Sequence, residues 1–200
     1  MTMIITRNYP EPPISQKEIL RYAGCQTEDS AIMEIMQECL REISEKLTYK
    51  VCYIETTLTI SADCCDFVFF KTHAAKLAEN LSGCEKAILF AATIGTEIDR
   101  SITRYGHIAP SKALMMQAIG AERIEALCNR FCEDIKKETG VRLKPRFSPG
   151  YGDLPLDAQK DIFNILDPAK HIGLTLNDSL LMSPSKSVTA FVGILDNIEQ

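Results

Sequence analysis

The chain has 200 residues, of which 46% are hydrophobic and 24% are charged. This length suits one sizeable core and is short for two, so we expect a single domain over residues 1–200. The formal net charge of -5 at pH 7 disfavours nucleic acid and anionic membranes as partners, because both attract clustered Lys and Arg side chains.

Targeting signals and cysteine usage indicate a cytoplasmic protein. No apolar run approaches the roughly 20 residues that cross a bilayer, and the opening MTMIITRNYPEPP lacks the pattern of a secretory signal. The eight cysteines fall mostly inside apolar periodic segments, which favours buried thiols over disulfides. Cys128 and Cys132 have helical i,i+4 spacing but no histidine nearby to complete a metal site, so we expect none.

Two helices are predicted in the first part of the chain. Ser15 and Glu18 have the spacing of a capping box, and the short helix that they begin would end at Gly24. The next helix carries apolar side chains at intervals of three and four residues between Ile32 and Leu47. This stripe predicts packing on a sheet.

Two strands and two further helices follow. Residues 49–60 are rich in β-branched and aromatic side chains, and residues 86–95 are nearly all apolar, as in a central strand covered on both faces. Residues 73–83, between these strands, favour a helix that closes at a glycine. A short helix is predicted over 96–106, and a long one over 110–140, begun by a proline and ended by a glycine.

The remainder of the chain has the character of short elements. A helix at 156–166 would stop before Pro168, and one further turn would end at Gly173. The run at 179–195 predicts two strands joined by the turn-forming residues 183–186, and hence a C-terminal hairpin.

The stretch RFSPGYGD differs from its surroundings. Pro149 and Gly150 occupy the two central positions preferred by a type II turn, between Ser148 and Tyr151. Arg146 beside such a bend could present its planar donors to a carboxylate or phosphate. The alternative is an ordinary surface turn, with Arg146 paired to a nearby acid.

The long helix supplies acidic candidates. Glu122 and Glu125 are three residues apart, on neighbouring positions of one helical face, and could hold an ammonium or sulfonium group. The alternative is a solvated acidic face paired with Arg123 or Arg130.

Other catalytic patterns are poorly supported. His73, His107 and His171 are isolated from one another, and none has a Ser or Cys partner in a nucleophile motif, which disfavours hydrolase chemistry. The stretch TIGTE at 93–97 is too poor in glycine for the nucleotide-binding loop of a Rossmann-type methyltransferase.

Four short motifs occur in order in the last third of the chain. They are Arg-x-x-Pro-Gly-Tyr at 146–151, Lys-His-x-Gly at 170–173, Leu-x-x-Ser at 176–179 and Ser-Val-Thr at 187–189. In order and spacing they closely resemble the activation domain at the C-terminus of cobalamin-dependent methionine synthase. Residues 86–139 resemble it more weakly.

The resemblance implies an α+β fold, with a mainly antiparallel sheet packed with long helices. It also implies a domain that binds S-adenosylmethionine for reductive remethylation of cob(II)alamin to methylcobalamin, which makes the chain an accessory part of a methyltransferase system in methionine biosynthesis. The cobalamin would be held by a partner module, and an electron-donor protein would supply the electron. The chain would act in trans on a separately encoded synthase.

The resemblance also implies roles for particular residues. Arg146 would take the ligand carboxylate, while Tyr151 and the backbone of Ser148, Pro149 and Gly150 would shape the pocket. Glu122 or Glu125 would face the cationic end of the ligand.

One part of the chain departs from the family pattern. An aromatic pair of the family's last strand aligns near Val192 and Gly193, and we expect Phe191 to compensate for it. The alternative function is a non-catalytic module that binds S-adenosylmethionine or docks onto another corrinoid protein.

Overall fold

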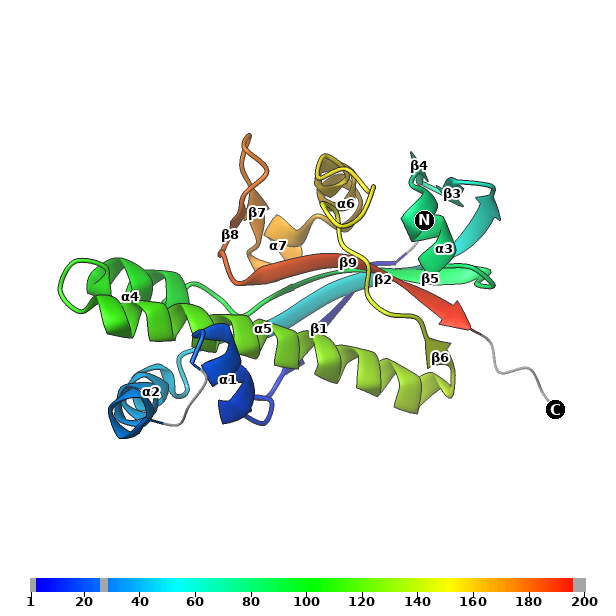
Figure 1. The fold of residues 1–200 in the computed structure, drawn as a ribbon. Helices are drawn as coiled ribbons and strands as arrows, with labels where there is room; N and C mark the ends of the chain where they lie inside the picture. The colour runs from blue at the N-terminus through cyan, green and yellow to red at the C-terminus, as the bar shows by residue number, and fades with distance from the viewer. Residues whose placement is uncertain (1–2, 26–28, 196–200) are drawn as a thin grey trace.

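The fold is built on a seven-stranded sheet, as a computed structural model of the protein shows for residues 3–25 and 29–195 (Figure 1). Every strand pairing in it is antiparallel. The strands, in spatial order, are β4 (Phe70–His73), β3 (Cys64–Phe67), β2 (Tyr49–Ser61), β5 (Lys86–Thr93), β9 (Ser187–Leu195) and β6 (Arg142–Leu143), and β1 (Ile5–Tyr9) also pairs with β2.

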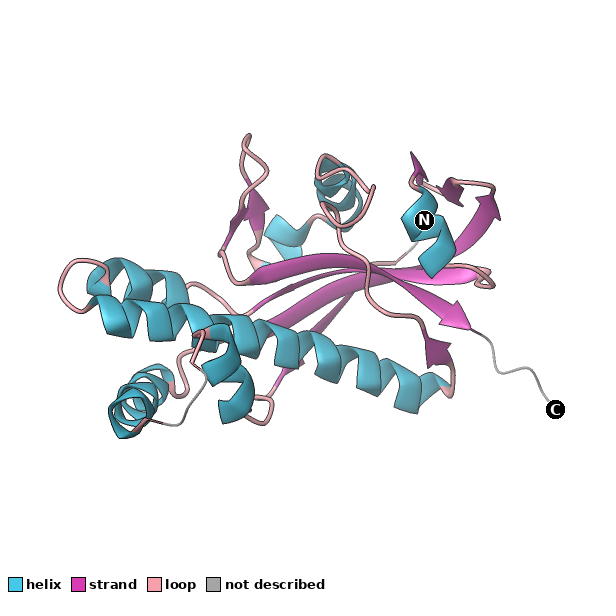
Figure 2. Cartoon of the chain, viewed as in Figure 1, coloured by secondary structure: helices cyan, strands magenta, loops and turns pink. Residues whose placement is uncertain are grey.

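Helices cover both faces of this sheet (Figure 2). On one face lie α1 (Gln16–Tyr22), α2 (Ser30–Ile43), α4 (Glu97–Tyr105) and α5 (Pro110–Thr139). On the other lie α3 (Ala75–Asn80), α6 (Ala158–Leu166) and α7 (Pro168–Ile172), beside a small sheet of β7 (Thr175–Leu176) and β8 (Met182–Ser183). The α+β prediction with a mainly antiparallel sheet is therefore confirmed.

Strand β5 lies between β2 and β9 and contributes to a hydrophobic cluster on each face. Ile88 and Phe90 belong to the cluster under α5, whereas Leu89 and Ala91 belong to the cluster under α6 and α7. Because successive side chains of a strand point to opposite faces, a strand buried on both must be apolar throughout. The predicted central strand is confirmed.

Helix α5 runs along one face of the sheet (Figure 1). It begins with Pro110 and ends at Gly140, whose positive φ of 71° forms the left-handed cap that glycine adopts without strain. The predicted long helix is confirmed. The expectation that α2 packs on the sheet is wrong, because α2 packs chiefly against α5, which lies between it and the strands.

The predicted C-terminal hairpin is also wrong. Strand β8 pairs with β7, and β9 pairs with β5 and β6. The connection between β8 and β9 is held on α4, because the Ser185 amide donates to Asp99 Oδ2 at 2.8 Å. The chain therefore passes from the small sheet to the main sheet without folding back on itself.

No disulfide joins the eight cysteines, all of which lie in the described ranges, and seven of them are buried. The predicted buried thiols are thus confirmed for all but Cys25, which is half-buried. Among the helices of the described residues, none has the length and hydrophobicity needed to cross a bilayer.

Candidate functional site

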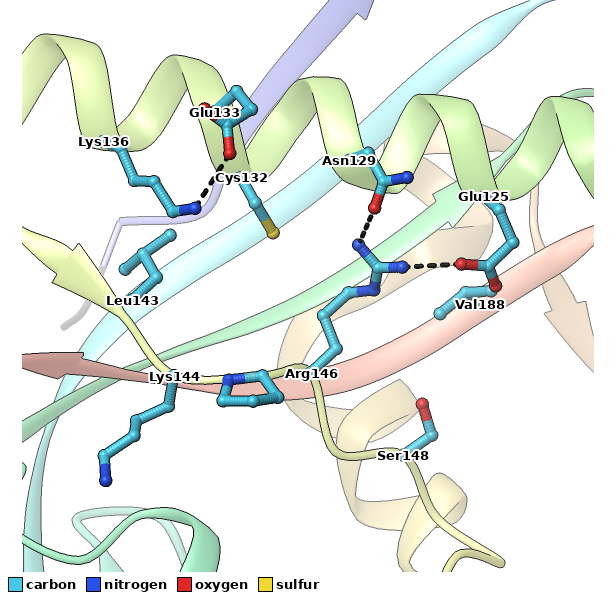
Figure 3. A pocket seen from close by; sticks show the side chains of 11 residues that line it. Glu125, Asn129, Cys132, Glu133, Lys136, Leu143, Lys144, Arg146, Ser148 and Val188 are labelled. Carbon is cyan, nitrogen blue, oxygen red and sulfur yellow. Dashed lines mark hydrogen bonds and ion pairs between the residues drawn. The ribbon is translucent and has the colours of Figure 1, made fainter. Parts of the chain in front are cut away.

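Arg146 is positioned by a stretch of backbone that follows β6 along β9. The Lys144 amide donates to the Gly193 carbonyl at 2.9 Å, and Phe147 and Phe191 exchange two hydrogen bonds of 2.9 Å. Neighbouring side chains on such an extended segment point to opposite sides. Phe147 is accordingly buried in the cluster under α6, while Arg146 faces α5 (Figure 3).

The Arg146 guanidinium contacts two residues on successive turns of α5. Its Nη2 donates to Glu125 Oε2 at 2.6 Å and its Nη1 to Asn129 Oδ1 at 2.7 Å (Figure 3). The Arg146 side chain is 24% exposed and that of Glu125 42% exposed, so water reaches both. The two partners lie four residues apart, a spacing that places them on one helical face.

These three residues line a cavity of about 670 Å³ between α5 and the backbone segment that carries Arg146 (Figure 3). Sequence reasoning placed Arg146, Ser148 and Glu125 in a site, and the structure brings all three to this cavity. The other lining residues are Asn129, Cys132, Glu133, Lys136, Leu143, Lys144, Pro145 and Val188.

The lining residues of α5 that sequence reasoning left out of the site lie on one helical face. They are Asn129, Cys132, Glu133 and Lys136, which follow Glu125 by four, seven, eight and eleven residues. That periodicity could have identified them, once Glu125 was known to face the cavity.

The predicted type II turn is confirmed. Tyr151 donates its amide hydrogen to the Ser148 carbonyl at 3.1 Å, and Gly150 has a φ of 84°, as the second central position of this turn requires. Ser148 lines the cavity, whereas Pro149, Gly150 and Tyr151 do not line it in the described structure. Tyr151 is 71% exposed, and its ring meets the Phe147 ring edge-on, with 5.7 Å between centroids.

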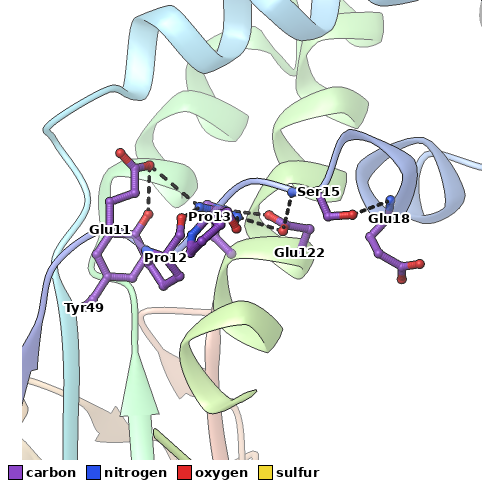
Figure 4. Close-up of polar contacts among 8 residues, drawn as sticks. Glu11, Pro12, Pro13, Ser15, Glu18, Tyr49 and Glu122 are labelled. Carbon is purple, nitrogen blue, oxygen red and sulfur yellow. Dashed lines mark hydrogen bonds and ion pairs between the residues drawn. The ribbon is translucent and has the colours of Figure 1, made fainter. Parts of the chain in front are cut away.

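Glu122 lies apart from the cavity, in a buried polar cluster under the N-terminal segment (Figure 4). Its carboxylate accepts hydrogen bonds from Arg123 at 2.5 and 2.7 Å and from the Ser15 amide at 3.0 Å. Arg123 also donates to the carbonyls of Pro12 and Pro13 at 2.6 and 2.7 Å. Both carboxylate oxygens of Glu122 are thus engaged, one of them directly with the N-terminal segment and both with Arg123, which also holds that segment on α5.

The thiols near Arg146 remain neutral. Burial raises the pKa of the Cys128 thiol, and it raises that of Cys132 too, although the positive charge of Arg146 partly opposes both shifts. Glu125 is therefore the negative group that faces the guanidinium. Further along the cavity, Lys136 Nζ pairs with Glu133 Oε1 at 2.8 Å (Figure 3).

The last strand contributes little to the cavity. Val188 lines it, but Phe191 is fully buried on the other face of the sheet, where its ring stacks on Phe67 with centroids 4.9 Å apart. The expectation that Phe191 compensates for a missing aromatic pair is wrong. A side chain at position 193 would force neighbouring atoms to shift, because an added Cβ would lie 2.6 Å from Cys84 Sγ.

The cavity therefore combines three cationic side chains, two carboxylates, an amide and a hydroxyl group, which suits a ligand that carries charges of both signs. Within the described ranges, no three His, Cys, Asp or Glu side chains are grouped so that they could hold a metal ion.

Comparison with known proteins gives the family. The family described as "Vitamin B12 dependent methionine synthase, activation domain" matches residues 65–197. A search of curated proteins finds no match. Among solved structures, the chain is similar to the "Crystal Structure of the MetH Reactivation Domain bound to AdoHcy", with a TM-score of 0.69 and 15% identity over 99% of this chain and 80% of that one. At this identity the likeness shows a shared fold. Because the family match spans most of the sequence, the chain belongs to the family of vitamin B12-dependent methionine synthase activation domains.

Proposed function

We propose that this chain binds S-adenosylmethionine in the cavity beside Arg146 and supports reactivation of a cobalamin-dependent methionine synthase in the cytoplasm. Membership of the activation-domain family supports this role. The similar solved structure is described as bound to AdoHcy, which is what remains of S-adenosylmethionine after methyl transfer. The overall chemistry is addition of one electron and one methyl group to cob(II)alamin, with the cobalamin held by a partner module and the electron supplied by a donor protein.

The observation that carries the proposal is Arg146 held opposite Glu125 at the cavity. S-adenosylmethionine carries a carboxylate at one end and ammonium and sulfonium charges close by. A guanidinium matches a carboxylate with parallel N–H donors, and a carboxylate such as Glu125 attracts the cationic groups. Ser148 adds a hydroxyl group at the cavity wall.

We assign Pro149 and Gly150 the role of holding the bend after Arg146. Tyr151 and Glu122 are left out of the proposed binding set, because neither lines the cavity. Glu125 is thus our choice between the two acids of α5. The role of this chain's residues is to bind and orient the methyl donor, and none of them is assigned a covalent step.

Replacing Arg146 tests the proposal. In Arg146→Ala the affinity for S-adenosylmethionine should fall roughly tenfold to a hundredfold, since a hydrogen bond to a charged group contributes about 1.5 to 3 kcal/mol. Isothermal titration calorimetry measures the change. Arg142→Ala is the matched control, because Arg142 is an exposed arginine on β6 outside the cavity. Unchanged binding by Arg146→Ala would refute the assignment.

Reactivation is a separate measurement. The wild-type chain, a cobalamin-loaded partner module, a reductant and S-adenosylmethionine should together convert cob(II)alamin to methylcobalamin, followed by its absorbance spectrum. Binding without conversion would support the alternative, a module that binds S-adenosylmethionine but does not promote remethylation.

A further inference from the structure

We infer that Asn129 is a positioning residue that fixes the Arg146 guanidinium and makes the cavity selective for a ligand carboxylate. The inference rests on the proposed function, since it concerns how the same cavity recognises the amino-acid end of its ligand. Asn129 acts through Arg146, whose Nη1 it holds at 2.7 Å (Figure 3).

The geometry requires two contacts to orient the guanidinium. A long Arg side chain has several rotatable bonds, and one contact leaves the planar head free to turn. Glu125 holds Nη2 and Asn129 holds Nη1, so the plane is set from two successive turns of α5. Other N–H groups of the five on the guanidinium remain for a ligand.

The second contact of Arg146 is made by a neutral amide, Asn129, and its lack of charge matters for binding. A second carboxylate at position 129 would add negative charge beside Arg146 and would compete with an incoming anion. The neutral Asn129 carbonyl accepts the hydrogen bond without adding charge. Arg146 thereby keeps its attraction for a carboxylate while its orientation is fixed.

Folding does not explain the contact. Asn129 is exposed, and the Arg146–Glu125 pair is partly exposed to water, so both contribute little to stability. The contrast is Arg123 on the same helix, which is fully buried and bonded to the N-terminal segment. The hydrogen bonds of Asn129, Arg146 and Glu125 therefore lie partly exposed beside a cavity, which is consistent with recognition of a ligand.

The test compares two ligands and two substitutions by calorimetry. Asn129→Leu removes the acceptor, and Asn129→Asp keeps an acceptor but adds charge. The ligands are S-adenosylmethionine and decarboxylated S-adenosylmethionine, which lacks only the carboxylate. Asn164→Leu, on the exposed side of α6, is the control.

In Asn129→Leu, the affinity for S-adenosylmethionine should fall about fivefold to tenfold, less than in Arg146→Ala, because the guanidinium remains but its orientation is no longer fixed. Affinity for the decarboxylated ligand should stay within about twofold, because no carboxylate depends on the orientation of Arg146. Asn129→Asp should also lower the affinity for S-adenosylmethionine, yet this variant should bind the decarboxylated ligand at least as tightly as the wild type does.

Equal losses for both ligands, or no loss with Asn129→Leu, would overturn the inference. Its failure is distinguishable from failure of the proposed function. If the wild type binds S-adenosylmethionine and Arg146→Ala does not, a silent Asn129→Leu refutes the positioning role alone. If the wild type binds neither ligand, the proposed function itself is refuted.

Discussion

At the scale of single residues, two glutamates of helix α5 pair with arginines in different physical roles: Glu122 with Arg123 of the same helix, and Glu125 with Arg146 of the segment after β6. Arg123 and Glu122 are buried, and backbone groups of Ser15, Pro12 and Pro13 complete their hydrogen bonds. Arg146 and Glu125 are partly exposed beside a cavity. Removing one partner of a buried pair leaves an uncompensated charge, whereas an exposed pair contributes about 1 kcal/mol or less.

Glu122→Ala and Glu125→Ala should therefore differ in stability. Glu122→Ala leaves Arg123 as a buried charge without its hydrogen-bonded carboxylate, with only Glu11 of the described residues at 3.9 Å, and should lower the free energy of unfolding by about 3 kcal/mol or more. Glu125→Ala is the matched control and should lower it by about 1 kcal/mol or less. Chemical denaturation followed by circular dichroism measures both. Similar losses would contradict the distinction.

At the scale of elements, β9 and the segment that follows β6 determine where Arg146 points. The two hydrogen bonds between Phe147 and Phe191 set the register of this segment, and a shift by one residue would turn Arg146 to the other face. Gly193 allows β9 and the segment after β6 to approach each other, because Lys144, Cys84 and Leu81 fill the space where a side chain would lie.

Gly193→Ala should consequently destabilise the protein. An added Cβ would lie 2.6 Å from Cys84 Sγ and 3.0 Å from Leu81 Cδ2, and overpacking of this kind costs about 1–3 kcal/mol. Thermal or chemical unfolding measures the loss. In the background of Cys84→Ala the same substitution should cost less, because the closest atom has been removed. An equal cost in both backgrounds would mean that the collision is not the cause.

At the scale of the whole molecule, one sheet separates two hydrophobic clusters. We infer that the described chain forms a single domain, because both clusters depend on the same strands. Six of the eight cysteines belong to these two clusters. Burial raises the pKa of Cys52 to about 12 and that of Cys65 to about 11, which keeps both as unreactive thiols near neutral pH.

Thiol labelling should follow this burial. In the native protein at about pH 8, iodoacetamide should modify Cys25 first, because thiolate and access together govern the rate. After unfolding, all eight cysteines should react. Mass spectrometry of labelled peptides distinguishes the sites. Labelling of Cys52 or Cys65 as fast as Cys25 would contradict the buried clusters.

Local sequence rules predicted the elements with strong signals. The long helix repeats its apolar positions over 30 residues, and the central strand is apolar almost throughout. The strands β1, β3 and β4 were missed, because they have only five, four and four residues, too few for propensity or alternation to identify them. The hairpin prediction failed because the contact of Ser185 with Asp99 joins residues far apart in the chain.

The sequence by itself determined the α+β composition, the extent of α5 and the bend after Arg146, because each depends on residues close together along the chain. It also determined the resemblance to the activation-domain family, which depends on an ordered set of motifs. Only the tertiary structure decided which acid of α5 meets Arg146. Glu122 and Glu125 look equivalent in sequence, but the N-terminal segment covers one and the cavity exposes the other. That difference arises from packing between distant segments, which helical spacing does not encode.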